Sequence, residues 1–432
     1  MEPNLPATVS GHADTQHTGV SRHGKSVIAS LFVLSAISFT DKSIASYLSV
    51  PIIGEFHLNT SQWGIASGSF FWLFSLSSLL VGAWSDKIGT TRLLSFVAVA
   101  WTIVQVATIF VASFPLFLLT RVGLGIGEGP FAGVAMTAAA KWLPRERRSL
   151  GFAIITSGNL VGPALLTPLL IICAAAYGWR SAFLILGVCS LLWLVGWMFV
   201  GREGTEGGDL VRGTEQGLQG QRTSWAGLLS LLFSRNVILI TLATFAAYWM
   251  QGLLLSWLAV YLIHVRHLQL VWIAAISGLS VLLTCLVQIL LSLLADRWFR
   301  RTGKMRVYVY MLCVVLVLTA IVNYSAVLVG PLAFSLLLLC MQPNGAAFPL
   351  AGTLIANITP PERRGTVQGA SIAIATIGGI MGPSMTGPLL QGAGQNLVQG
   401  FQTIYLISTV LLISIALTAF LFIWPDKGLP IT

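Results

Sequence analysis

Charged residues are scarce in this chain: Lys, Arg, Asp and Glu make up 9% of its 432 residues, whereas 56% are hydrophobic. With a mean hydropathy of +0.85, this composition excludes a soluble protein of this length and indicates a polytopic membrane protein. Cysteine is also rare, and each of the five lies in an apolar segment, where a thiol acts as a small hydrophobic group. We therefore expect no disulfides among Cys173, Cys189, Cys285, Cys313 and Cys340.

Signs of catalysis are missing as well. The sequence has no nucleophile–base pair, no Cys or His spacing typical of zinc or iron–sulfur sites, and no phosphate-binding loop. The glycine-rich segment 123–130 is not a dinucleotide loop, because it lies within an apolar run, so its glycines instead favour close helix packing. We therefore expect that the protein is not an enzyme and that it binds neither a cofactor nor a metal.

Long apolar runs are abundant. About 20 apolar residues are needed to cross the hydrocarbon core as a helix, and the sequence contains twelve such runs, which predict an all-α membrane protein with twelve transmembrane helices. The predicted spans are 27–50, 62–84, 93–112, 115–140, 149–175, 181–200, 236–263, 271–294, 307–324, 327–356, 366–390 and 402–424.

Lys and Arg are nearly absent from alternate loops. If both termini are cytoplasmic, 20 of the 24 Lys and Arg residues fall in the tails and cytoplasmic loops, and only Arg180 and Arg266 lie in outer loops. This asymmetry follows the positive-inside rule and explains the net charge of +10 without a nucleic-acid partner. We expect a multi-pass protein of the cell inner membrane with both termini in the cytoplasm.

The chain divides into two halves of six spans. The polar, glycine-rich stretch 201–235 is typical of a flexible linker. The expected organisation is a cytoplasmic tail (1–26), an N-terminal six-helix bundle (27–200), a cytoplasmic linker (201–235), a C-terminal six-helix bundle (236–424) and a short cytoplasmic tail (425–432).

Two internal repeats support this division. The basic turn 141–148 after the fourth span recurs at 359–364 after the tenth, and each is followed by Gly-Pro and then Pro-Leu-Leu. The turn 82–92 between the second and third spans has a degraded copy at 295–306. Repeats at equivalent positions predict two halves in the same orientation, related by a pseudo-two-fold axis along the membrane normal, with the substrate between them.

The Gly-x-x-x-Asp-Lys-x-Gly-x-x-Arg turn at 82–92 resembles the signature loop of the major facilitator superfamily, and the resemblance covers nearly the whole chain. It implies the twelve-helix fold of that superfamily and does not identify the substrate. Charges at this cytoplasmic surface are placed to latch one half against the other, although ordinary topological charge is the alternative. The candidate gate residues are Asp86, Lys87, Arg92, Asp296 and Arg297.

Four ionisable side chains lie inside predicted spans of the first half: Asp41, Lys42, Arg121 and Glu128. A charge within the bilayer costs several kcal/mol unless it is paired or hydrated, so such residues usually mark a path for a substrate or protons. Arg121 and Glu128, seven residues apart, share one helix face about 10 Å apart along its axis. Asp41 and Glu128 are the candidate proton carriers, and the alternative is a static buried network of zero net charge.

The second half has no charged residue well inside its predicted spans. It offers amides, a hydroxyl and a phenol that suit hydrogen bonding to a small solute, although single polar residues in membrane helices are often interhelical links instead. The candidates are Tyr248, Gln251, Gln342, Asn344 and Thr376.

A narrower resemblance is carried by segments 39–42, 121–128, 142–147, 157–159, 167–170 and 178–180. Together they resemble the anion:cation symporters, which include bacterial carriers of D-galactonate, hexuronates and phthalate. The resemblance implies that Asp41 and Glu128 are the protonatable pair and that Arg121 regulates Glu128. It also implies that Lys42 replaces a basic residue, usually Arg, that meets the substrate carboxylate.

Departures from that pattern concern the substrate. Phe39 and Phe74 stand where sugar-acid carriers tend to have tyrosines, Asn159 stands where a glutamine is common, and Ile372 replaces an asparagine. Fewer hydroxyls and amides favour a less polar carboxylate, with aromatic acids and sugar acids both left open. Phe39, Phe74 and Asn159 are among the expected substrate contacts.

The sequence therefore predicts a monomeric secondary transporter that imports a small organic anion by proton symport through alternating access. A proton-coupled exporter of hydrophobic or drug-like compounds is the alternative, and Lys42 and Arg121 argue against a cationic cargo. Two repeated halves with a coupling carboxylate agree better with alternating access than with the continuous pore of a channel.

Overall fold

A computed structural model describes residues 21–78, 80, 88–143, 148–204, 225–327, 342–360, 363–394 and 396–425. Within these ranges every regular element is helical, as the sequence predicts. The helices of the first half are α1 (Arg22–Tyr47), α2 (Ser49–Glu55), α3 (Thr60–Gly68), the 3₁₀ turn η1 (Ser69–Phe71), α5 (Thr90–Ile109), α6 (Phe114–Glu128), α7 (Phe131–Trp142), α8 (Arg148–Tyr177) and α9 (Arg180–Val200).

The second half contains a matching set. Its elements are α11 (Trp225–Leu232), α12 (Arg235–His264), α13 (Leu270–Thr302), α14 (Arg306–Val327), the 3₁₀ turn η3 (Pro343–Ala346), α16 (Ala347–Ile358), α17 (Arg364–Ala375), α18 (Ile377–Gly392) and α19 (Leu397–Phe422). Short helix α11 lies within the segment 201–235 that was expected as a linker.

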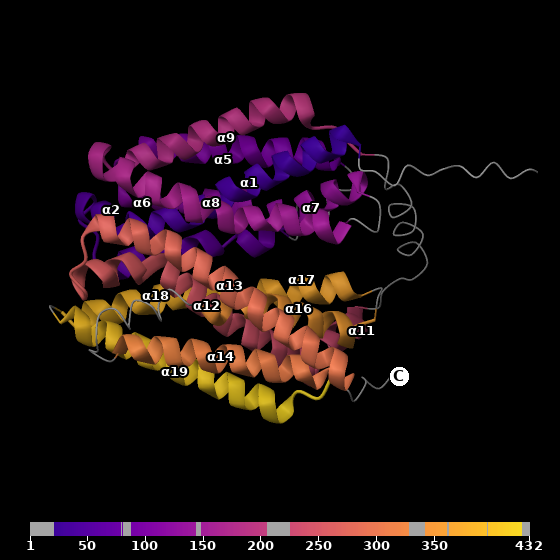
Figure 1. The fold of residues 1–432 in the computed structure, drawn as a ribbon. Coiled ribbons are helices and arrows are strands. Elements are labelled where there is room, and N and C mark those ends of the chain that lie inside the picture. The colour runs from indigo at the N-terminus through magenta and orange to yellow at the C-terminus, as the bar shows by residue number, and fades with distance from the viewer. Residues whose placement is uncertain are drawn as a thin grey trace, which may run out of the picture.

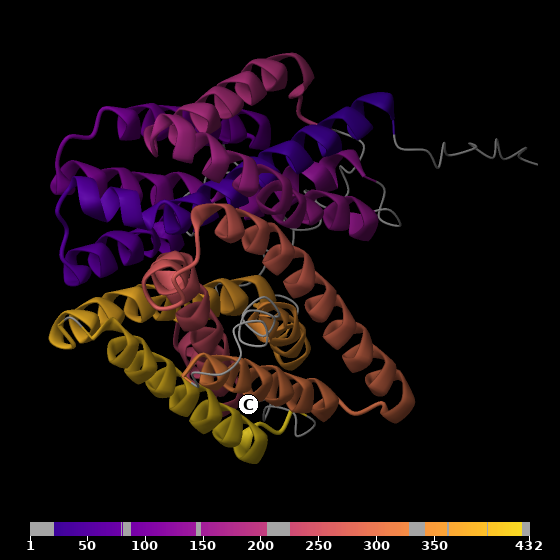
Figure 2. The same ribbon diagram turned by 60° about the vertical axis from the view of Figure 1, so that its left-hand side comes forward.

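The two halves form separate bundles (Figures 1 and 2). In the first bundle α1 packs on α8 and α5 packs on α9, and in the second α12 packs on α17 and α18 while α14 packs on α19. These are the equivalent pairings of the first with the fifth span and the third with the sixth in each half. The bundles meet through α3 against α18, α8 against α13 and α1 against α12.

Nine helical stretches among the described residues are long and apolar enough to cross a membrane. The other three predicted spans are less regular. The span 62–84 changes to a 3₁₀ turn at η1, the span 115–140 is divided between α6 and α7, and much of the span 327–356 lies outside the described residues. The predicted span 366–390 is also interrupted, where α17 gives way to α18 at Thr376.

The break between α6 and α7 falls at Gly129 and Pro130. Proline has no backbone N–H and its ring clashes with the preceding turn, so it interrupts a continuous helix. The glycines before it allow close approach: a Cβ on Gly125 would collide with the carbonyl oxygen of Phe70, and one on Gly129 with that of Phe74. This confirms that the glycines of this segment serve helix packing.

Side-chain hydrogen bonds between the bundles gather mostly at one end of the molecule. Ser46 Oγ donates to the Leu254 carbonyl at 3.2 Å, Trp63 Nε1 donates to the Ser256 carbonyl at 2.9 Å, and Thr60 Oγ1 donates to the Gly387 carbonyl at 2.9 Å. Glycines bring α3 and α18 together here, because a Cβ on Gly64 would lie 2.5 Å from the Pro383 carbonyl oxygen. The bundles are therefore closed against each other at the end that contains residues 46–67.

Candidate functional site

The four intramembrane charges predicted from the sequence are all buried in the first bundle. The exposed fractions are 2% for Asp41, 4% for Arg121 and 2% for Glu128, and the Lys42 side chain is 14% exposed. Asp41 and Lys42 lie on α1, and Arg121 and Glu128 lie on α6. These four residues are therefore enclosed by protein, and none of them faces lipid freely.

Lys42 and Glu128 form an ion pair across the two helices. Lys42 Nζ lies 2.7 Å from Glu128 Oε2, and Ser38 Oγ donates a hydrogen bond to the same oxygen at 3.3 Å. The second oxygen, Glu128 Oε1, is enclosed and has no hydrogen-bond partner among the described residues. Because the Glu128 side chain is fully buried, its negative charge depends on the Lys42 ammonium for compensation.

Aromatic rings surround the Lys42 ammonium. Its Nζ lies 4.4 Å from the ring centre of Phe39, 5.4 Å from that of Phe74 and 5.9 Å from that of Phe70. A cation over an aromatic face is stabilised by the ring quadrupole. The structure thus brings the predicted contacts Phe39 and Phe74 to the predicted anion ligand Lys42.

Arg121 is in a different environment. Its guanidinium lies between the rings of Phe117 and Phe183, with Cζ at 5.4 and 5.2 Å from their centres. Its Nε and Nη2 atoms are enclosed and have no hydrogen-bond partner among the described residues. Asp41 and Glu128 are near enough to interact with its charge, yet the ion pair that Glu128 forms is with Lys42.

Asp41 is as enclosed as Glu128 and lies beside Gln105 of α5, which is only 1% exposed. Its Oδ1 atom has no hydrogen-bond partner among the described residues. A buried carboxyl with an unsatisfied oxygen is a place where a proton is readily accommodated.

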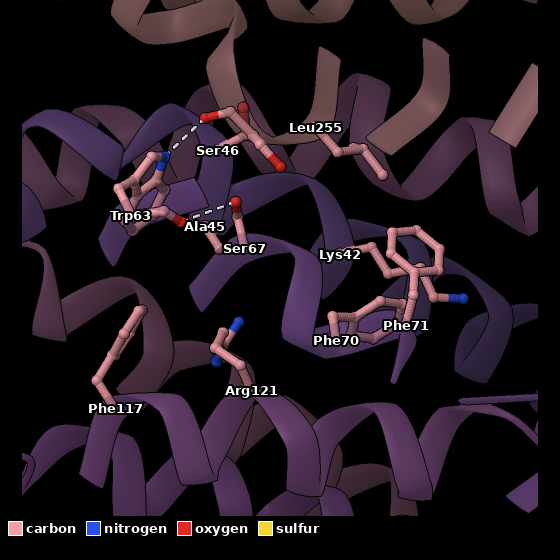
Figure 3. A pocket seen from close by; sticks show the side chains of 11 residues that line it. Lys42, Ala45, Ser46, Trp63, Ser67, Phe70, Phe71, Phe117, Arg121 and Leu255 are labelled. Carbon is pink, nitrogen blue, oxygen red and sulfur yellow. Dashed lines mark hydrogen bonds between the residues drawn. The ribbon is translucent and has the colours of Figure 1, made fainter. Parts of the chain in front are cut away.

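A cavity between the bundles opens onto Lys42 and Arg121 (Figure 3). The guanidinium of Arg121 points toward the space beneath Trp63 and Ser67, whereas the Lys42 ammonium is directed away from Arg121. The remaining lining is aromatic, aliphatic or hydroxyl-bearing and contains no acidic side chain: Ala45, Ser46, Trp63, Ser67, Phe70, Phe71, Phe117, Leu255 and Ser256.

The predicted polar contacts of the second bundle do not line this cavity. Tyr248 packs edge-on against Phe71 and Phe348, with ring centres 6.3 and 4.8 Å away, and Asn344 Nδ2 donates to the Ala247 carbonyl at 3.4 Å. The Thr376 hydroxyl meets the hydroxyl of Ser75 across the bundle interface. Tyr248 and Thr376 thus lie where the bundles meet, while Asn344 links helices of one bundle.

Three further predicted contacts lie outside the cavity lining. Asn159 on α8 is half-buried and its enclosed Oδ1 has no hydrogen-bond partner among the described residues. Gln251 is half-buried on α12, and Gln342 is buried at the start of η3. Their roles in substrate binding stay predictions.

The predicted cytoplasmic gate is only partly described. Asp86 and Lys87 lie outside the described residues, and Arg92, near the start of α5, is exposed. Asp296 and Arg297 are exposed on α13, where Asp296 Oδ1 accepts a hydrogen bond from the Tyr308 hydroxyl at 2.8 Å. The latch between the halves stays a prediction.

Sequence reasoning missed several residues around the site. Ser38 is four residues before Lys42, and Ser46 is four residues after it, so helical spacing along α1 places them on one face. Phe117 is likewise four residues before Arg121 on α6. The contributions of Gln105, Trp63 and Phe183 depend on packing between distant helices, for which one sequence gives no signal.

Comparisons with known proteins agree with this architecture. A family model described as Major Facilitator Superfamily matches residues 31–383. The chain is 28% identical over 291 residues to the probable sulfoacetate transporter SauU of Cupriavidus necator, a match that covers 65% of this chain and 66% of that protein. It is 24% identical over 417 residues to the hexuronate transporter of Bacillus subtilis (94% and 96% covered) and 25% identical over 386 residues to the D-galactonate transporter of Escherichia coli (84% and 88% covered).

Solved structures with low sequence identity share the fold. A bacterial homologue of the human lysosomal transporter Spinster, inward-facing and unoccupied, superposes with a TM-score of 0.76 at 18% identity, covering 93% of this chain and 97% of that one. The D-xylose–proton symporter superposes with a TM-score of 0.70 at 16% identity, covering 94% and 99%. At these identities the likeness concerns the arrangement of helices alone.

Proposed function

The chain belongs to the Major Facilitator Superfamily of membrane transporters, and from this we propose that it imports a small organic anion by proton symport through alternating access. It is a multi-pass protein with the twelve-helix fold of this family and, like its relatives, a transporter rather than an enzyme. The similar curated proteins are described as a probable sulfoacetate transporter, a hexuronate transporter and a D-galactonate transporter, and all of these solutes are organic acids. In the proposal it acts as a monomer in the cell inner membrane, with both termini in the cytoplasm.

The observation that carries the proposal is the buried pair of Lys42 and Glu128, 2.7 Å apart. A substrate carboxylate and the Glu128 carboxylate compete for the same ammonium group. When Glu128 binds a proton it no longer holds Lys42 by charge, and Lys42 is then free to bind the anion. Proton binding therefore strengthens anion binding, and by linkage anion binding strengthens proton binding to the same degree.

The lining of the cavity supports an anionic rather than a cationic cargo. Its two charged side chains, Lys42 and Arg121, are both positive, so a cation would be repelled in a site of low dielectric. This argues against the exporter of cationic drugs, although an exporter of neutral hydrophobic compounds remains the alternative that transport assays must separate.

Alternating access requires the bundles to open at one end and close at the other. The hydrogen bonds of Ser46, Thr60 and Trp63 close the end that contains residues 46–67. In the proposed topology this end is the outer one, so the structure corresponds to a carrier that is shut to the outside. Releasing these bonds would open the path from the outside to Lys42 and Arg121.

The proposal is tested in proteoliposomes with an imposed pH gradient, acidic outside. The panel is radiolabelled sulfoacetate, glucuronate, D-galactonate and phthalate. We expect gradient-driven accumulation of at least one of them, by about tenfold per pH unit for each coupled proton, since one pH unit corresponds to about 1.36 kcal/mol. A symporter predicts uptake, whereas an exporter predicts efflux without gradient-stimulated uptake.

The Glu128→Gln variant separates coupling from binding. Gln cannot exchange a proton, so the variant should still exchange labelled for unlabelled anion but should accumulate it less than the parent does against a gradient. Glu55→Gln is the matched control, because Glu55 forms an ion pair with Arg180 of the first bundle and is 42% exposed at its side chain. This variant should accumulate anion as the parent does. Accumulation by Glu128→Gln equal to that of the parent would contradict the proposed coupling.

A further inference from the structure

Among the described residues no carboxylate forms an ion pair with the buried cation Arg121, although Asp41 and Glu128 are near enough to interact with its charge. Arg121 is 4% exposed, its faces are covered by Phe117 and Phe183, and its Nε and Nη2 atoms have no hydrogen-bond partner among the described residues. These two atoms form the edge of a guanidinium that binds an oxyanion through two parallel hydrogen bonds. A buried charge that is not paired is costly, so this guanidinium is suited to receive an anionic group from elsewhere.

The second cation of the cavity already has an anionic partner. Lys42 is held by Glu128, and its ammonium points away from Arg121 in Figure 3. The two cations thus occupy separate positions along one cavity, Arg121 beneath Trp63 and Ser67, and Lys42 beside the α6 carboxylate. An anion at one of them leaves the other in place.

Charge balance then decides between a solute with one negative charge and a solute with two. With Asp41 and Glu128 ionised, the four side chains sum to zero, and with both candidate proton carriers protonated they sum to +2. A monoanion would leave one buried cation uncompensated, whereas a dianion would restore zero. We propose that the transported solute is a small dianion, with one oxyanion group bound by Lys42 and the other by Arg121.

The lining also constrains the body of the solute. The Ser67 hydroxyl already donates to the Trp63 carbonyl at 2.9 Å, and the Ser46 hydroxyl donates to the Leu254 carbonyl. Phe70, Phe71 and other apolar side chains supply most of the remaining wall. Few donors are left for the hydroxyl groups of a sugar acid, so the chemistry of the lining favours a short apolar or aromatic spacer between the two oxyanion groups.

This inference rests on the proposed function, and it is tested with matched pairs of solutes that differ in one negative charge. The pairs are succinate with succinamate and phthalate with phthalamate, and sulfoacetate is a further dianion. Binding to the purified full-length protein is followed by tryptophan fluorescence, since Trp63 lines the cavity. We expect at least one dianion to bind about tenfold or more tightly than its matched monoanion, as suits one additional charge-assisted contact.

Transport gives a second, independent readout. In proteoliposomes with a potassium diffusion potential, a dianion entering with two protons carries no net charge, so its uptake should not respond to an inside-negative potential. A monoanion entering with two protons carries one positive charge and should be stimulated. A dianion flux that rises with the potential, or matched monoanions that bind as tightly as dianions, would overturn the dianion proposal.

The variant Arg121→Gln should weaken dianion binding by about tenfold or more and leave monoanion binding nearly unchanged, and Arg180→Gln serves as the control. If Arg121→Gln does not fold, Arg121→Lys retains the charge, and the paired comparison of mono- and dianions on the parent protein still tests the dianion proposal. Equal weakening of mono- and dianions by Arg121→Gln contradicts the assignment of Arg121.

If monoanions are driven by the pH gradient and dianions are not, the proposed symport stands and this inference fails. If no member of either panel binds or moves, both fail.

Discussion

A buried and an exposed ion pair of the first bundle, Lys42 with Glu128 and Arg180 with Glu55, should differ sharply in strength, and a pair of double-mutant cycles measures this. In the buried pair, the side chains of Lys42 and Glu128 are 14% and 0% exposed. In the exposed pair, those of Arg180 and Glu55 are 31% and 42% exposed, with a closest distance of 2.6 Å. Distance alone would rank the two pairs as equal, so burial is the variable that the comparison isolates.

The magnitudes follow from what each substitution leaves behind. Lys42→Gln leaves a fully buried carboxylate with Ser38 as its one described hydrogen-bond donor, which should cost about 3 kcal/mol. Glu128→Gln should cost less, about 1 to 2 kcal/mol, because Lys42 keeps its aromatic neighbours and some access to the cavity. The double variant removes both charges and should recover much of the loss, for a coupling free energy of about 2 kcal/mol or more.

The exposed pair supplies the matched control, with an expected coupling free energy of about 0.2 to 1 kcal/mol. The assay is the free energy of unfolding of the detergent-solubilised protein, titrated with a denaturing detergent and followed by tryptophan fluorescence. Equal coupling free energies for the two pairs, or a double variant less stable than Lys42→Gln alone, would refute the conclusion that Glu128 depends on Lys42 for its charge.

Two further predictions concern the closed end of the molecule. Burial alone would raise the pKa of Glu55, but hydrogen bonds from Arg180 and Trp179 outweigh it and hold the pKa below its ordinary value of 4.5; the stability from this pair is therefore present above pH 4.5 and lost as the pH falls below that value. Thermal unfolding midpoints between pH 7 and 3.5 should fall less steeply for Glu55→Gln than for the parent, and equal slopes would contradict the pairing. Gly64→Leu should force this end open, since even a Cβ would lie 2.5 Å from a carbonyl oxygen of α18, whereas Gly54→Leu has open space around it. In a background without the native cysteines, maleimide labelling of Ser46→Cys from outside should increase with Gly64→Leu and not with Gly54→Leu. Equal labelling would contradict the closure of this end.

Much of the architecture is predictable from the sequence because the bilayer restricts the options. Apolar runs of sufficient length must be helices. The internal repeats at 141–148 and 359–364 predict two equivalent bundles, and the packing of α1 on α8 and of α12 on α18 agrees with this prediction. Helix interruptions were harder to place. Pro130 does break the fourth span, yet Pro163 and Pro168 lie inside a continuous α8, so proline alone does not locate a break.

The sequence predicts which charged residues are buried in the site. It does not predict which of them pair with one another. Helical spacing places Arg121 and Glu128 on one face of α6, and the resemblance to anion:cation symporters implies that Arg121 regulates Glu128. In the structure Glu128 pairs with Lys42 of α1, while Arg121 lies between two phenylalanines. The relative rotation and depth of α1 and α6 decide this, and a single sequence carries no distance between helices.

At the closed end, Ser46, Thr60 and Trp63 of the first bundle all donate to main-chain oxygens of the second. A peptide carbonyl is the same whichever residue carries it, so most substitutions at the accepting positions leave the fastening intact. The residues that select the solute can therefore change without any change in the contacts that close this end.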